Sequence, residues 1–152
     1  MNFPIEIIRK TRVNVLKVVD GLTIEQLNKI PEGFNNNIIW NIAHLVAAQQ
    51  GICYKRAGLP MLIDENYFNA YKPDSKPEVF VDEAGFEYIK HLLVSTIDQF
   101  EVDYNKGIFT NYPAWMSRYN LEIANIDEAI SFLPFHEGLH TGYMMALKRA
   151  IA

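Results

Sequence analysis

The chain has 152 residues and 49% hydrophobic content, which favours one domain over residues 1–152 with an ordinary core. Its 14 basic and 18 acidic residues give a net charge of -4, which offers no electrostatic basis for binding nucleic acid or an anionic membrane. No apolar run approaches the roughly 18 to 20 residues of a membrane span, the start lacks the layout of a signal peptide, and the single cysteine excludes an internal disulfide, so we expect a cytoplasmic protein.

Three helical segments are predicted in the first part of the chain. Apolar residues recur at the helical period over residues 4–20, which predicts a first long helix. Thr23 has the position of an N-cap and predicts a short helical turn. A second long helix is predicted to begin at Asn36 or Asn37, either of which could cap it, and to stop at Gly58.

A loop rich in Pro, Asp and Tyr is predicted for residues 58–80. Asp82 is expected to cap a third long helix, which ends near Gly107. Residues 108–124 are aromatic and predict an irregular segment with a short extended piece. The last helix is predicted from near Asp127 to the end of the sequence. Four long amphipathic helices predict an all-α four-helix bundle, and the long connections leave its topology open.

Two histidines in the last predicted helix, His136 and His140, are four residues apart. This spacing places both side chains on one helix face, where both can reach one metal ion. The segment HEGLH also matches the H-E-x-x-H motif of zinc proteases. The 12 residues that follow His140 in this sequence contain no His, Asp, Glu or Cys. A third ligand is therefore expected upstream, and a protease is not favoured.

His44, in the middle of the second predicted helix, is the preferred third ligand. At about 100° per residue, Asn41 lies within about 60° of His44, and the same side carries small residues. Such a small and partly polar face suits a cavity better than an apolar seam. The alternative is that all three histidines are structural, since a buried histidine often only makes a satisfied hydrogen bond. His91 is interpreted as a surface or partly buried residue.

Two segments resemble the DinB-like superfamily of helical bundles. Residues 39–45, IWNIAHL, resemble the first metal-ligand segment of that family, and residues 133–144, LPFHEGLHTGYM, resemble its closing segment. The resemblance implies an up-down-down-up bundle with His44, His136 and His140 as metal ligands. It also suggests a homodimer. Where many family members carry Gln, this chain has Tyr143.

Three neutral imidazoles suit Zn²⁺ or Ni²⁺ and leave at least one coordination position open, as in catalytic sites. The chain is therefore interpreted as a metal-dependent enzyme that acts on a small molecule. The resemblance implies transfer of low-molecular-weight thiols such as bacillithiol or mycothiol, and a hydrolase is also open. The alternative is a non-catalytic stress-response bundle that binds a metal or a small ligand.

Four further residues are candidates for the surroundings of the histidines. Asn41 is expected to support a ligand or to contact substrate. Tyr143 returns to the face of the first histidine of the pair and is a candidate pocket residue. Glu137 is open to three interpretations, which are a general base, a partner of a ligand and a solvated surface charge, and the surface charge is favoured. Arg118, in the aromatic segment, could cap the pocket mouth and bind a carboxylate.

Overall fold

The computed structural model describes all 152 residues and is mostly helical, which confirms the predicted all-α class. The helices α1, α3, α5 and α6 are long, and shorter elements connect them. In chain order the elements are α1 (Phe3–Val19), α2 (Ile24–Asn28), α3 (Ile38–Gln50), the π-helical turn η1 (Gly51–Lys55), α4 (Glu65–Tyr71), α5 (Glu83–Asn105), β1 (Trp115–Met116), β2 (Glu122–Ile123) and α6 (Ile126–Ala150).

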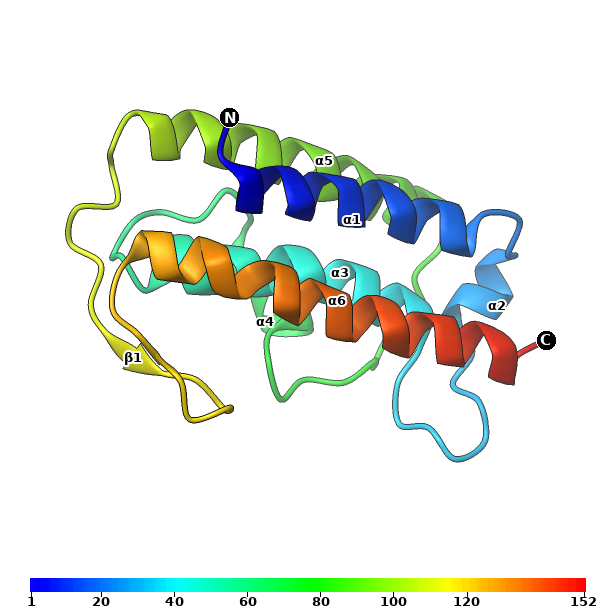
Figure 1. Ribbon diagram of the computed structural model, residues 1–152. Coiled ribbons are helices and arrows are strands. Elements are labelled where there is room, and N and C mark those ends of the chain that lie inside the picture. The colour runs from blue at the N-terminus through cyan, green and yellow to red at the C-terminus, as the bar shows by residue number, and fades with distance from the viewer.

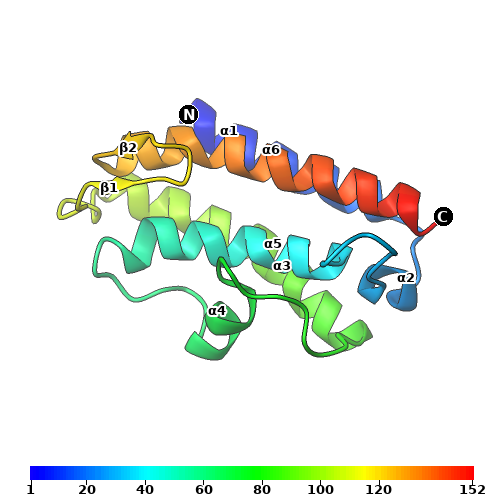
Figure 2. The same ribbon diagram turned by 90° about the horizontal axis from the view of Figure 1, so that it is seen from below.

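The four long helices lie side by side along one axis (Figures 1 and 2). Helices α1 and α6 run in one direction, and α3 and α5 run in the opposite direction. Helix α1 packs against α5 and α6, and α3 packs against the same two helices. Each long helix therefore has two long neighbours, and α3 and α6 share the interface in which the histidines lie.

Side-chain caps begin the helices close to where the sequence predicts them. The side chain of Asn37 accepts the N–H of Trp40 at 2.8 Å and caps α3. Asp82 caps α5, and Thr23 caps α2 as part of a capping box. Helix α6 begins slightly earlier than predicted, because Asn125 caps it in place of a residue near Asp127.

The long segment between α3 and α5 differs from its prediction as a loop, because it contains the helix α4. Asp64 caps α4, and the aromatic rings of Tyr67 and Phe68 are buried. The hydroxyl of Tyr67 donates to the carbonyl of Ala43 at 3.0 Å and ties α4 to α3. The aromatic segment contains the predicted extended piece as a two-stranded antiparallel ribbon in which Trp115 pairs with Ile123.

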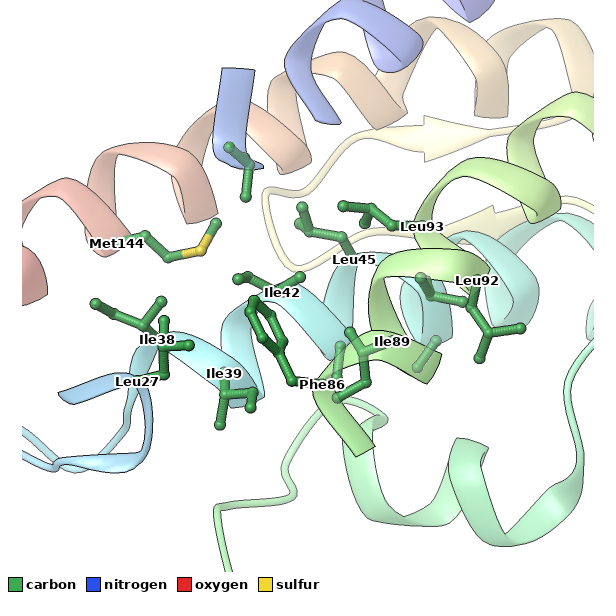
Figure 3. Close-up of a cluster of buried hydrophobic side chains, with 14 of the residues drawn as sticks. Leu27, Ile38, Ile39, Ile42, Leu45, Phe86, Ile89, Leu92, Leu93 and Met144 are labelled. Carbon is green, nitrogen blue, oxygen red and sulfur yellow. The ribbon is translucent and has the colours of Figure 1, made fainter. Parts of the chain in front are cut away.

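Helix α3 is buried along its whole length, from Ile38 to Gln50. Figure 3 shows apolar side chains of α2, α3, α5 and α6 that meet around it. A helix that is buried on every side has no solvated face for polar residues. Its polar side chains, Asn41, His44, Gln49 and Gln50, therefore lie inside the protein. None of the helices has the length and hydropathy needed to cross a membrane.

Candidate metal centre

The structure brings His44, His136 and His140 together between α3 and α6. One ligand atom from each of the three rings lies within 4.8 Å of the others. Nε2 of His44 and Nε2 of His136 face each other at 3.3 Å. The residues come from positions 92 apart in the sequence and meet because α3 packs directly against α6.

The ring of His44 is held by a backbone carbonyl of α4. Its Nδ1 lies 2.7 Å from the carbonyl oxygen of Tyr71. Since a carbonyl can only accept, Nδ1 of His44 carries the proton and Nε2 has a free lone pair. The indole of Trp40 stacks on one face of the ring, with centroids 4.6 Å apart and an interplanar angle of 10°. The tautomer and the orientation of His44 are therefore both fixed.

Asn41 holds His140 in the same way. The distance from Nδ1 of His140 to Oδ1 of Asn41 is 2.8 Å. The amide of Asn41 is itself oriented, because its Nδ2 donates to the carbonyl of Asn37 at 2.7 Å. The Oδ1 atom must therefore accept, so that Nδ1 of His140 is protonated and Nε2 is free. Asn41, which was expected to support a ligand or to contact substrate, therefore contacts the ring of His140.

The ring of His136 differs from the other two because its Nδ1 is buried and has no hydrogen-bond partner. Its Nε2 faces Nε2 of His44, which carries a lone pair, at 3.3 Å. Two imidazole lone pairs that face each other repel unless a proton or a metal ion lies between them. Three imidazole nitrogens within 4.8 Å of one another match the donor set of a zinc or nickel site. The group could therefore hold a divalent metal ion.

Burial keeps these histidines neutral. It lowers the pKa of His136 to about 3, with further contributions from His140, His44 and Arg118. Burial and then His44 lower the pKa of His140 to about 4. The pKa of His44 is also lowered by burial, although the hydrogen bond to Tyr71 opposes the shift. Metal ions bind neutral imidazole, so no proton has to leave these rings at neutral pH.

A pocket of about 350 Å³ opens beside His136. Its walls come from α3, η1, α4 and the segment after α4. The lining residues are Ala47, Ala48, Gly51, Ile52, Lys55, Arg56, Phe68, Pro73 and His136. The small residues that the sequence indicates on this side of the second helix, Ala47, Ala48 and Gly51, therefore line the pocket. A ligand in this pocket has direct access to His136.

A sequence model of the DinB superfamily matches residues 7–144. The chain belongs to the DinB superfamily. The matched range contains all three histidines, Asn41 and the pocket residues, and it confirms the resemblance seen in the two histidine segments. A search of curated proteins found no match.

Glu137 was interpreted from the sequence as a solvated surface charge, and this interpretation is wrong. The residue is 0% exposed, and both carboxylate oxygens accept hydrogen bonds from Arg12, the closest at 2.7 Å. Burial raises the pKa of Glu137, and the guanidinium of Arg12 opposes that shift. The glutamate of HEGLH thus points into the core and is paired, whereas the general base of a zinc protease must face its metal.

Three other residues considered in the sequence do not line the pocket beside His136. Tyr143 packs edge-on against Phe34, with centroids 5.8 Å apart, and does not line the pocket beside His136 as expected. His91 is exposed on α5. Arg118 forms an exposed ion pair with Asp74 at 3.0 Å. It lies near enough to lower the pKa of His44 and His136, although it does not line the pocket.

Two contributors to the site were not found from the sequence. The carbonyl of Tyr71 holds His44, and Arg56 lines the pocket. A backbone carbonyl has no sequence signal. The basic pair of Lys55 and Arg56 near the end of the second helix could have indicated an anion site. The π-helical turn that sets the direction of these side chains has no signal in the sequence.

Proposed function

We propose that this DinB-superfamily protein is a metal-dependent enzyme that transfers a low-molecular-weight thiol to an electrophile. The observation that carries the proposal is the shared geometry of His44 and His140. Each ring donates its Nδ1–H to a fixed oxygen, so that Nε2 is free within a cluster of three imidazoles. A purely structural histidine has no need of this arrangement.

We infer that His44, His136 and His140 hold Zn²⁺ or Ni²⁺. Three neutral nitrogen ligands suit either ion, and three protein ligands leave a position open for a small molecule. When bound, such an ion supplies Lewis acidity, which favours the thiolate form of a thiol. Asn41 and the carbonyl of Tyr71 orient two of the rings.

In the proposed reaction, the sulfur of the thiol forms a bond to an electrophilic carbon. The leaving group departs with its electron pair, and the thiol proton passes to solvent. In this proposal the reactants bind in the pocket that His136 lines, against apolar wall residues such as Phe68 and Ile52.

We also infer that the chain is a single domain with the up-down-down-up bundle that the superfamily resemblance implies. The directions of the four long helices in Figures 1 and 2 support this topology. It brings α3 and α6, which carry the histidines, into direct contact.

The metal content of the purified, tag-free protein tests the ligand set. Elemental mass spectrometry should find close to one zinc or nickel per chain in the wild type, and strong losses in His44→Ala and in His140→Ala. The matched control is His91→Ala, because His91 is exposed on α5 and is not one of the three clustered histidines. Wild-type protein that takes up no metal after loading and dialysis would overturn the proposal.

Catalysis is tested separately on the metal-loaded protein. A panel of thiols, including cysteine and bacillithiol, is mixed with an electrophile whose absorbance changes on substitution, such as a chlorodinitrobenzene. Turnover should appear in the wild type and in His91→Ala and should be lost in His44→Ala. Bound metal without turnover for any thiol would favour the non-catalytic binding protein instead.

A further inference from the structure

We propose that the pocket beside His136 recognises a carboxylate on a small apolar molecule, and that Arg56 binds this carboxylate. The inference deepens the proposed function and rests on it, because it names the chemical class of one reactant. Arg56 and His136 line the same pocket. A molecule whose acid end binds Arg56 can therefore extend its other end toward the histidines.

The pocket has the size and the walls of a small-molecule site. Its volume of about 350 Å³ falls within the range of roughly 300 to 1,000 Å³ that is typical of ligand pockets. Its walls are mostly apolar or small, with Ala47, Ala48, Ile52, Phe68 and Pro73. Apart from His136, the polar side chains that line it are both cationic, which favours an anion with an apolar body.

Arg56 is preorganised to bind an anion. Its guanidinium stacks over the ring of Trp115, 3.9 Å from the centroid. Trp115 is fixed in turn, because its Nε1 donates to the hydroxyl of Tyr112 at 2.8 Å, and this hydroxyl donates to the carbonyl of Ile52 at 2.8 Å. A contact through the face of the guanidinium does not use its N–H groups, so they are free to form a bidentate pair with a carboxylate.

Arg56 is also the unpaired cation of this region. Neither the ion pairs nor the side-chain hydrogen bonds of the chain include Arg56. Lys55 already pairs with Glu65 at 3.5 Å and lies over the ring of Phe68. Arg118 pairs with Asp74. The guanidinium of Arg56 lies over an aromatic ring and has no acidic partner within the protein. It is therefore available to the carboxylate of a bound molecule.

The π-helical turn η1 explains why Arg56 faces the pocket. In an uninterrupted α-helix, Arg56 would lie about 80° around the axis from Ala48, eight residues earlier. A turn with one extra residue rotates all later side chains back by about 100°. Arg56 then falls close to the line of Ala48, and both residues line the pocket. Such turns are frequent at functional sites because they redirect side chains in this way.

The test measures binding of 3-phenylpropanoate to the zinc-loaded protein by isothermal calorimetry, with 3-phenylpropanamide as its uncharged counterpart. The wild type should bind the carboxylate and should bind the amide at least tenfold more weakly. Arg56→Gln should weaken carboxylate binding by tenfold or more. The control Arg149→Gln, an exposed arginine in the last turn of α6, should bind like the wild type.

Three results would overturn the inference: the wild type binds neither probe, the amide binds as tightly as the carboxylate, or Arg56→Gln retains wild-type affinity. The zinc content of Arg56→Gln is measured beside its affinity and should equal that of the wild type. An unchanged metal content separates a failure of carboxylate recognition from a failure of the histidine site. The wild type could also hold no metal and still bind the carboxylate in a way that depends on Arg56. That result would overturn the proposed function and leave the inference about Arg56 standing.

Discussion

Oδ1 of Asn41 accepts the Nδ1–H of His140 at 2.8 Å, and this contact ties the first turn of α3 to the face of α6 that carries the two histidines. It fixes the tautomer of the histidine and leaves Nε2 as the free nitrogen. The amide that makes this contact is itself held by the carbonyl of Asn37. Two residues of α3, Asn41 and His44, thus act on the same centre in different ways.

Asn41→Ala should lower the affinity for zinc by about 10- to 100-fold while leaving the three histidines in place. The reason is that His140 loses the acceptor that orients its ring and selects its tautomer. Competition with a chromophoric chelator measures the change. Asn66→Ala, at an exposed position in α4, serves as the control. Equal zinc affinity for Asn41→Ala and the control would show that the contact does not tune the centre.

Arg12→Met should destabilise the protein by about 3 to 5 kcal/mol, because it leaves the carboxylate of Glu137 buried without its partner. The distance between Nη2 of Arg12 and Oε1 of Glu137 is 2.7 Å, and both residues are almost fully buried. The double variant Arg12→Met/Glu137→Leu should recover most of that loss, since it removes both charges and fills the space with apolar groups. Urea denaturation measures the free energies of unfolding.

Arg9→Met is the matched control for this cycle. Arg9 lies one turn earlier on α1, and its contacts with Glu6, Asp98 and Glu101 are partly exposed. Exposed ion pairs contribute little, so this change should alter stability by no more than about 1 kcal/mol. A loss in Arg9→Met as large as that in Arg12→Met would contradict the distinction between the two sites.

The metal-free protein should lose stability as the pH falls from about 6.5 toward about 5. The folded state lowers the pKa of His136 from 6.5 to about 3 and that of His140 from 6.5 to about 4. Below 6.5 the unfolded chain therefore binds more protons than the folded chain, and protons favour unfolding. Above 6.5 the contribution of both groups is fully present. Each histidine should contribute a slope of about 1.4 kcal/mol per pH unit within this window.

Urea titrations at several pH values give this slope directly. His140→Gln should reduce it by about 1.4 kcal/mol per pH unit, because one titrating group is gone. A slope that is independent of His140 would place the pH dependence elsewhere in the chain.

Two glycine substitutions should change stability in opposite directions. A Cβ at Gly51 would meet Cε2 of Phe68 at 3.0 Å and Cζ at 3.3 Å, so Gly51→Ala should cost about 1 kcal/mol or more. A Cβ at Gly138, inside α6, would meet nothing within 4 Å. Gly138→Ala should therefore stabilise the protein by about 0.5 to 1 kcal/mol. Thermal unfolding of the two variants beside the wild type measures both effects, and a gain in Gly51→Ala would contradict the contact.

Local features of the fold were predictable from the sequence. Asn37, Asp82 and Thr23 cap their helices as expected, because capping depends on residues three positions away. The grouping of His44 with His136 and His140 followed from helical spacing and from the family resemblance. The seven-residue helix α4 was missed, because so short a helix has little periodicity and forms through its packing on α3.

The environment of Glu137 was not predictable, because its partner Arg12 lies 125 residues away in the sequence. An acidic residue beside a histidine on an amphipathic helix is normally solvated, and only the packing of α1 against α6 buries it here. The hydrogen bond to His44 was missed for a related reason, since its acceptor is the backbone of Tyr71.

All five N–H groups of Arg12 find acceptors, which belong to the three other long helices. They are the carbonyls of Leu45 and Leu93, the hydroxyl of Thr96 and the carboxylate of Glu137. Leu45 follows His44, and Glu137 follows His136. Arg12 therefore forms hydrogen bonds with the residue next to a metal-ligand candidate on both α3 and α6. An axial slip of either helix would break these bonds between buried groups. The hydrogen bonds of one arginine thus hold α3 and α6 in register, and with them the two helices that carry the histidines.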